Sequence, residues 1–292
     1  MNTHEAQLAG RDVRRVGFGA MQLPGRGVFG PPADREQALA VLRRAVELGV
    51  NHIDTAQYYG PDVSNELIHT ALHPYPDDLV LVSKVGGARD ADGGWIPAQR
   101  PEELRRGVED NLRSLAVDRV DVVNLRLMGD HAASGDQVVP LADQLGEMIA
   151  LRDEGKVGGI GLSSVTLEQL EAGLAQTEIA CVQNPMSLLS RGDQPTLDRC
   201  RDAGIPYVPF FPLGSAFPGQ PHVTDEPVVA EIAERLGVTR AQVGLAWLLA
   251  HSPNILLIPG TSSVGHVEEN IAAGEISLDA DAMDALATVG GV

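Results

Sequence analysis

Long hydrophobic runs are missing from this sequence of 292 residues. No stretch of about 18 consecutive apolar residues occurs, which is the length that a membrane-spanning helix requires. The first residues, MNTHEAQLAGRDVRR, also lack the apolar core of a secretory signal. Neither membrane insertion nor secretion is indicated, and we expect a cytoplasmic protein with no membrane partner.

Cysteine is rare as well. Cys181 and Cys200 are the only cysteines, and their separation matches no CxxC motif or other metal-ligand spacing. Cys181 lies in the apolar segment IACVQN, where a small buried thiol is common. The histidines form no HExxH motif and no clustered set of ligands. We expect structural cysteines and no metal site.

Positive charge is scarce. Lysine and arginine together number 22 against 40 acidic residues, which gives a formal net charge of −18. Binding to nucleic acid requires a cationic face, so nucleic acid is not an expected partner. Lys84 and Lys156 are the only lysines, so the place of each lysine in the fold is informative.

Short apolar or β-branched segments alternate with segments of helical period along the chain. The expected strands lie at 16–20, 50–56, 78–86, 120–125, 156–164, 179–184, 205–211 and 255–260. The expected helices lie at 34–48, 62–72, 101–115, 140–153, 166–175, 194–203, 225–236, 239–250 and 266–273, with a closing helix after Leu278.

This alternation predicts an α/β fold. Strands that are apolar on both faces are typical of a parallel sheet covered by helices. Eight such repeats fit a (β/α)8 TIM barrel, which we expect to form a single domain over residues 1–292. A doubly wound dinucleotide-binding sheet is the alternative, but no GxGxxG motif follows the first strand.

Three predicted strand ends carry unusual polar residues. Asp54 and Tyr59 lie in HIDTAQYYG, Lys84 lies in VLVSKVGG and Arg126 lies in VVNLRLMG. The carboxyl ends of parallel strands meet at one mouth of a barrel, so we expect these side chains to face one cavity. Each residue alone would be explained by a surface ion pair or by a packed tyrosine. Together they predict a site for acid–base chemistry.

Tyr59 is the candidate acid. A phenol is a weak acid at neutral pH, with a pKa near 10, unless nearby positive charge favours the phenolate. Lys84 and Arg126 would supply that charge, and Asp54 would neutralise and orient Lys84. Such a phenol can protonate a developing alkoxide.

The segments HIDTAQYYGP, SKVG, GLSS, VQN, PFFPLG and IPGTSSVGHVEEN, in this order over nearly the whole chain, resemble those of the aldo-keto reductase family. The resemblance implies a (β/α)8 barrel that binds NADPH without a Rossmann domain. It also implies hydride transfer to a small-molecule aldehyde or ketone. Tyr59 would be the proton donor, and Asp54 and Lys84 its tuning pair.

The resemblance also implies a set of cofactor contacts. Ser163 and Gln183 would hold the carboxamide of the nicotinamide, Phe210 would stack on its ring, and Ser164 stands where the family usually has asparagine. Glu269 and Asn270 would contact the adenine. Further cofactor contacts are expected at Gly19, Ala20, Pro212, Leu213 and Gly214.

The segment IPGTSSVGHVEEN also predicts an anion site on physical grounds. The hydroxyls of Thr261, Ser262 and Ser263 precede a helix whose free amides favour phosphate. Many members of the family carry lysine and arginine where this chain has Gly260 and His266. We therefore expect NADPH with a weak clamp on its 2′-phosphate, so that NADH is possible.

Arg126 stands where the family usually has a catalytic histidine. A guanidinium stays charged and only donates hydrogen bonds, so it cannot relay a proton but can polarise a carbonyl. His131, in the following loop, is a weak candidate for that relay.

The segments VVNLRLMGD, KVGGARDADGGWIP and PFFPLGS are most similar to the bacterial pyridoxal reductase branch of the family. That resemblance implies reduction of pyridoxal to pyridoxine, in which Arg126 could also hold the phenolic oxygen beside the aldehyde. Met21 and Trp95 are further candidate substrate contacts. Their alternatives are core packing for Met21 and a loop anchor for Trp95.

Two other functions remain open. A reductase of a sugar or of a secondary-metabolite carbonyl would keep this chemistry and differ in its loops. A regulatory subunit that binds NADP(H) without catalysis would keep the barrel alone. We expect a monomer or a weak oligomer.

Overall fold

The computed structural model describes residues 5–128, 133–214 and 219–290. Its main sheet is parallel and has six strands in the order β10, β9, β8, β5, β4, β3. These strands are β3 (Phe18–Gly19), β4 (His52–Asp54), β5 (Val80–Val85), β8 (Val120–Arg126), β9 (Val157–Ser163) and β10 (Val182–Gln183).

The sheet closes through two short strand positions. Tyr207 forms parallel bridges with Val182 of β10 and with Ile255, and Leu257 forms a parallel bridge with Val16 ahead of β3. The predicted (β/α)8 barrel is thereby confirmed. The segments expected to be its last two strands form single bridges rather than extended strands. Prolines in both segments, Pro206 and Pro209 among them, lack the N–H that a longer ladder requires.

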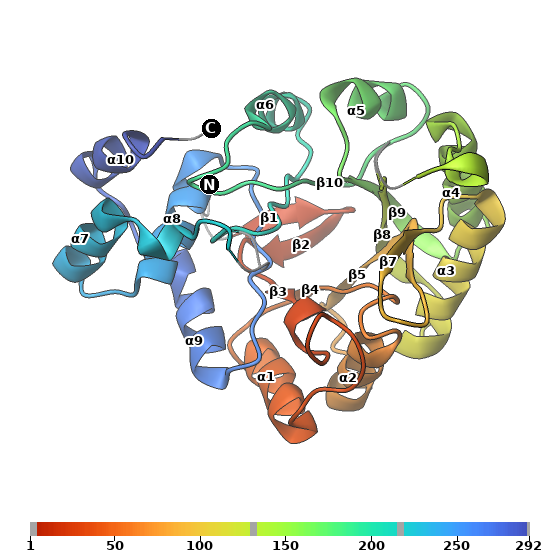
Figure 1. The fold of residues 1–292 in the computed structure, drawn as a ribbon, viewed down its shortest axis with the longest axis horizontal. Helices are drawn as coiled ribbons and strands as arrows, with labels where there is room; N and C mark the ends of the chain where they lie inside the picture. The colour runs from red at the N-terminus through yellow and green to blue at the C-terminus, as the bar shows by residue number, and fades with distance from the viewer. Residues whose placement is uncertain (1–4, 129–132, 215–218, 291–292) are drawn as a thin grey trace.

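Ten helices surround the strands in the described part of the chain (Figure 1). They are α1 (Arg35–Glu47), α2 (Val63–Leu72), α3 (Pro101–Leu115), α4 (Leu141–Asp153), α5 (Leu167–Leu174), α6 (Gln194–Asp202), α7 (Pro227–Leu236), α8 (Arg240–His251), α9 (Val264–Ala272) and α10 (Ala280–Ala287). Capping boxes fix two of their starts: Thr166 with Gln169 at α5, and Thr239 with Gln242 at α8. The expected helices are therefore present, with ends that differ by up to two residues.

The structure contains two antiparallel hairpins that the sequence pattern does not predict. The first joins β1 (Glu5–Leu8) to β2 (Arg11–Arg14) and lies across the centre of the ring of helices in Figure 1. Its buried Leu8 and Val13 pack with the apolar residues inside the barrel. The second joins β6 (Gly87–Arg89) to β7 (Trp95–Pro97) in the segment that follows β5.

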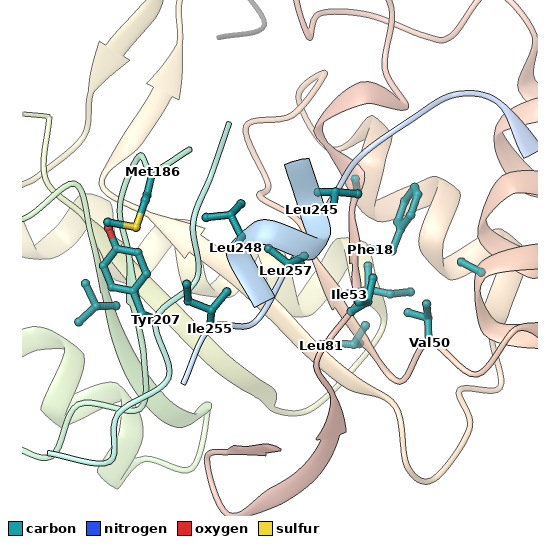
Figure 2. Packing of buried hydrophobic residues seen from close by; sticks show 14 of the residues in the cluster. Phe18, Val50, Ile53, Leu81, Met186, Tyr207, Leu245, Leu248, Ile255 and Leu257 are labelled. Carbon is teal, nitrogen blue, oxygen red and sulfur yellow. The ribbon is translucent and has the colours of Figure 1, made fainter. Parts of the chain in front are cut away.

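The core has two layers because side chains alternate along each strand. Outward residues such as Ile53 and Leu81 belong to one buried cluster with helix residues such as Leu245 and Leu248 of α8 (Figure 2). Inward residues such as Val80, together with the hairpin, fill the barrel interior.

Both cysteines are buried and free, as expected of structural thiols, and burial raises the pKa of each to about 12. No helix in the described ranges is long and apolar enough to cross a bilayer.

Candidate active site

Five polar side chains occupy the last inward positions of five neighbouring strands. They are Asp54 of β4, Lys84 of β5, Arg126 of β8, Ser163 of β9 and Gln183 of β10. The strand register pairs Ser163 with both Arg126 and Gln183. Because inward positions recur at every second residue, these side chains meet at the carboxyl-end mouth of the barrel.

Lys84 and Asp54 form an ion pair inside the mouth. Their relative exposures are 2% and 4%, and the ammonium donates a hydrogen bond to Oδ1 of Asp54. Nζ of Lys84 also donates to the carbonyl oxygen of Thr55 at 3.0 Å. Oδ2 of Asp54 accepts a hydrogen bond from Nε2 of Gln183 at 2.9 Å. Both carboxylate oxygens therefore have donors, as burial of a charged pair requires.

Tyr59 lies beside this pair. Its side chain is buried, and Nζ of Lys84 lies 5.0 Å from the centroid of its ring. Burial raises the pKa of Tyr59, the negative charge of Asp54 raises it further, and the charges of Arg126 and Arg89 lower it. The charge of Arg126 acts in the expected direction, but burial of the phenol and the charge of Asp54 outweigh it. Tyr59 is accordingly held as a protonated phenol.

Arg126 brings a second cation to the same mouth. Its guanidinium carbon lies 5.7 Å from the ring centroid of Phe210. The guanidinium makes no hydrogen bond or ion pair with any residue that the structure describes. The backbone of Arg126 is held by Gln99, whose Nε2 donates a hydrogen bond to the carbonyl oxygen of Arg126 at 2.9 Å. His131 lies outside the described residues.

Gly86 permits this placement. A Cβ atom at this glycine would lie 2.2 Å from the carbonyl oxygen of Arg126, and its φ of +101° is in the region that favours glycine. The close approach of the chain after β5 to the end of β8 therefore depends on Gly86.

A cavity of about 370 Å³ joins this cluster to the start of α9. Most of the predicted site residues line it: Gly19, Met21, Asp54, Tyr59, Lys84, Arg126, Gln183, Phe210, Pro212, Leu213, Gly214, Gly260, Thr261, His266, Glu269 and Asn270. The cavity thus contains both the acid–base cluster and the predicted anion end.

Sequence reasoning missed six further lining residues. They are Gln22, Phe211, His222, Ala241, Ile258 and Pro259. Ile258 and Pro259 are the first two residues of the segment IPGTSSVGHVEEN, so the sequence did carry a signal for them. His222 reaches the cavity because an antiparallel bridge joins it to Gly214, which is a tertiary contact without a sequence signature.

Six predicted residues do not line this cavity: Ala20, Ser163, Ser164, Ser262, Ser263 and Trp95. Ala20 and Ser163 are fully buried. Ser164 has a φ of +58° and lines a neighbouring cavity of about 510 Å³ instead.

Two of the hydroxyls ahead of α9 accept hydrogen bonds from backbone amides at the start of the helix. Oγ of Ser263 accepts a hydrogen bond from the amide of His266 at 3.5 Å, and Oγ1 of Thr261 accepts one from the amide of Ser263 at 3.1 Å. Thr261 still lines the cavity, whereas Ser262 and Ser263 do not. Thr261, His266 and Asn270 line this end of the cavity, and the three-hydroxyl anion site stays a prediction.

Two buried polar atoms near the cluster lack partners. Oε1 of Gln183 and Oγ of Ser163 make no hydrogen bond with the residues that the structure describes. A primary amide offers both donors and an acceptor, so it could pair with both atoms. The described ranges contain no group of three or more His, Cys, Asp or Glu residues that could hold a metal ion.

The comparisons with known proteins agree with this geometry. A sequence model of the aldo/keto reductase family matches residues 15–290. The chain is 48% identical over 288 residues to pyridoxine 4-dehydrogenase of Escherichia coli strain K12, and the match covers 98% of each protein. It is 36% identical to an uncharacterized oxidoreductase of Schizosaccharomyces pombe, over 92% of this chain and 84% of the relative.

A solved structure is similar over nearly its whole length. An aldo-keto reductase from Klebsiella pneumoniae in complex with NADPH superposes with a TM-score of 0.81, at 28% sequence identity and over 98% of this chain and 94% of that one. The family match, the shared barrel and the polar cluster at its mouth lead to one conclusion. This chain belongs to the aldo/keto reductase family.

Proposed function

We propose that the protein is an NADPH-dependent reductase that converts pyridoxal to pyridoxine. The observation that carries the proposal is the arrangement of Tyr59, Lys84 and Arg126, which has no ion-pair partner among the described residues, around one cavity. The 48% identity to pyridoxine 4-dehydrogenase over 98% of both chains supports the choice of substrate.

The cavity residues fit a nicotinamide cofactor. Oε1 of Gln183, which lines the cavity, makes no hydrogen bond with the described residues and matches a donor of a carboxamide; Oγ of Ser163, buried directly behind the lining, is likewise without a described partner. Phe210 offers an aromatic face beside them, and Thr261, His266 and Asn270 offer polar groups at the other end. The Klebsiella structure with NADPH shows that this fold holds that cofactor in a relative.

In the proposed reaction, Tyr59 is the proton donor. A bound NADPH would supply the hydride that reduces the aldehyde carbon and would thereby be oxidised to NADP⁺. Tyr59 gives its phenolic proton to the carbonyl oxygen, so the aldehyde becomes a primary alcohol and the phenolate regains a proton from water. Lys84 and Arg126 stabilise the transient phenolate because their positive charges lie close to the ring.

Arg126 would recognise the substrate as well as polarise it. Pyridoxal carries a phenolic oxygen beside its aldehyde, and a guanidinium can donate two parallel hydrogen bonds to adjacent oxygens. The Arg126 guanidinium has the free donors that this contact needs, since no described residue occupies them.

Steady-state oxidation of NADPH tests the proposal. We expect turnover with pyridoxal and weaker turnover with simple ketones. Reduction of nitrobenzaldehyde without reduction of pyridoxal would overturn the substrate and leave the reductase chemistry. Tight NADPH binding without oxidation over a broad carbonyl panel would overturn both the substrate and the reductase chemistry, and would favour a regulatory subunit.

Three further expectations stay predictions. They are a single domain over residues 1–292, a cytoplasmic location and a monomer or weak oligomer.

A further inference from the structure

Arg89 connects two loops that flank Tyr59. It lies at the end of β6, in the segment after β5, and reaches the segment 25–30 after β3. Both segments follow barrel strands at their carboxyl ends, on the rim that carries the candidate site. Nη1 of Arg89 donates to the carbonyl oxygen of Gly93 at 2.8 Å, and Nη2 donates to that of Gly27 at 2.6 Å. The guanidinium therefore holds the hairpin and the loop together.

The same guanidinium stacks on Trp95. Its carbon lies 3.6 Å from the ring centroid of Trp95, which is close contact for a cation over an aromatic face. The Trp95 ring meets the rings of Tyr58 and Tyr59 edge-on, with centroids 5.7 Å and 6.4 Å away. Arg89 thus acts on the surroundings of Tyr59 through one tryptophan.

Trp95 and Phe29, which both contact Arg89, form what we call the aromatic wall. Trp95 and Phe29 are each 37% exposed, which is unusual for large apolar side chains. Gly93 has no side chain and packs against Phe29; a Cβ atom there would lie 3.0 Å from the ring. Phe29 also lies beside Arg89, with 5.8 Å between its ring centroid and the guanidinium carbon.

The loop needs this support because its backbone is strained. Val28 is β-branched and has a φ of +59°, a conformation that such residues rarely adopt. Its carbonyl oxygen accepts a hydrogen bond from the amide of Gly60 at 3.1 Å and another from Nη2 of Arg89. Loss of Arg89 would remove one of the two hydrogen bonds to this carbonyl oxygen.

We propose that Arg89 is a positioning residue that sets substrate specificity. Its guanidinium contacts both Trp95 and Phe29, which form the aromatic wall at the rim of the mouth, outside the lining of the 370 Å³ cavity, with Trp95 beside Tyr59. This wall favours flat, ring-bearing aldehydes over small open-chain ones as they enter the mouth. Flat rings gain from stacking or edge contacts with aromatic side chains, whereas an open-chain aldehyde does not. The inference rests on the proposed reductase activity and adds the determinant of its substrate class.

The kinetic test compares Arg89→Ala with wild type on nitrobenzaldehyde and on propanal. We expect KM for nitrobenzaldehyde to rise about tenfold, while KM for propanal and Kd for NADPH change less than about twofold; tenfold corresponds to about 1.4 kcal/mol. In a Trp95→Ala background, Arg89→Ala should have a clearly smaller effect than in wild type, because only the contact with Phe29 is then left to lose. Equal effects on both aldehydes, or additive effects in the double variant, would overturn the proposal.

Arg89→Lys separates the fork geometry from the charge. Lysine keeps the positive charge but not the planar stack or the paired donors, so we expect it to behave like Arg89→Ala. Restoration of wild-type KM by lysine would show that Arg89 acts as a point charge and would overturn the positioning role. Arg235→Ala, which removes an exposed ion pair with Asp279, is the matched control for loss of charge.

Acrylamide quenching of tryptophan fluorescence tests the wall without any turnover. Trp95 is exposed and Trp247 is buried, so quenching reports mainly on Trp95. Arg89→Ala should increase quenching because the guanidinium no longer shields one face of the Trp95 indole from solvent. Arg235→Ala should leave quenching unchanged. Unchanged quenching would overturn the proposal even in an active enzyme. Increased quenching in a protein that reduces no aldehyde would instead contradict the reductase function.

Discussion

Gln183 donates a hydrogen bond to Asp54 across the barrel mouth, with 2.9 Å between Nε2 and Oδ2. The other oxygen of Asp54 accepts a hydrogen bond from Lys84. The carboxylate of Asp54 therefore connects Gln183, a predicted nicotinamide contact, to the ammonium of Lys84. This link orients the amide of Gln183 and leaves its Oε1 free of partners among the described residues.

Asp54→Asn should therefore destabilise the protein and abolish turnover. The change leaves the ammonium of Lys84 buried without a counter-charge, which costs about 3 kcal/mol in comparable buried pairs. Urea unfolding measures the loss. Adding Lys84→Met should recover much of the stability and none of the activity. A single variant as stable as wild type would show that the pair is not held as described.

Tyr59→Phe should lose at least about a hundredfold in kcat, because general acid catalysis contributes at least that much. The Kd for NADPH should not change. Tyr58→Phe is the matched control, since Tyr58 is equally buried, adjacent in sequence and absent from the cavity lining. Its hydroxyl has no partner among the described residues, so its loss should leave turnover and stability close to wild type. Similar losses in both variants would contradict the assignment of Tyr59.

His52 should make stability depend on pH. Burial lowers its pKa to about 4, and a contact with the backbone of Leu257 opposes this shift only in part. Between about pH 6.5 and 4 the unfolded chain binds a proton that the folded protein excludes, so stability falls as the pH falls. The loss over this window is about 3 kcal/mol.

Urea unfolding at a series of pH values, compared with His52→Gln, measures this contribution. His69→Gln is the control at a histidine outside the barrel interior. The wild-type curve should be steeper than that of His52→Gln and parallel to that of His69→Gln. Parallel curves for wild type and His52→Gln would refute the assignment.

The main features of the site follow from alternation within strands. Asp54, Lys84, Arg126 and Gln183 lie at strand ends, and parallel strands must bring such positions together. The raised pKa of Tyr59 could not be predicted, because it depends on burial by distant segments.

Other features depend on contacts that local patterns do not encode. The β1–β2 hairpin turns at Ala9 and Gly10, both with positive φ, but an alanine there gives little signal. The approach of Arg89 to Gly27 joins residues 62 positions apart. Single bridges replaced the last two expected strands, although the prolines within them were a visible sign.

Arg126→Met should change selectivity. Methionine keeps much of the side-chain length and removes the donors that we assign to the phenolic oxygen of pyridoxal. We expect kcat/KM for pyridoxal to fall about a hundredfold and that for nitrobenzaldehyde to fall less than about tenfold, since loss of a charged hydrogen-bond partner costs about 3 kcal/mol. Equal falls for both aldehydes would show that Arg126 acts on the carbonyl alone.

The central claim is tested most directly by product analysis. Wild-type protein is incubated with NADPH and pyridoxal, and pyridoxine is quantified by chromatography against the NADPH consumed. We predict one pyridoxine formed for each NADPH oxidised, and none with Tyr59→Phe on the same timescale. Absence of pyridoxine from the wild-type reaction, while nitrobenzaldehyde is reduced under the same conditions, would contradict the account.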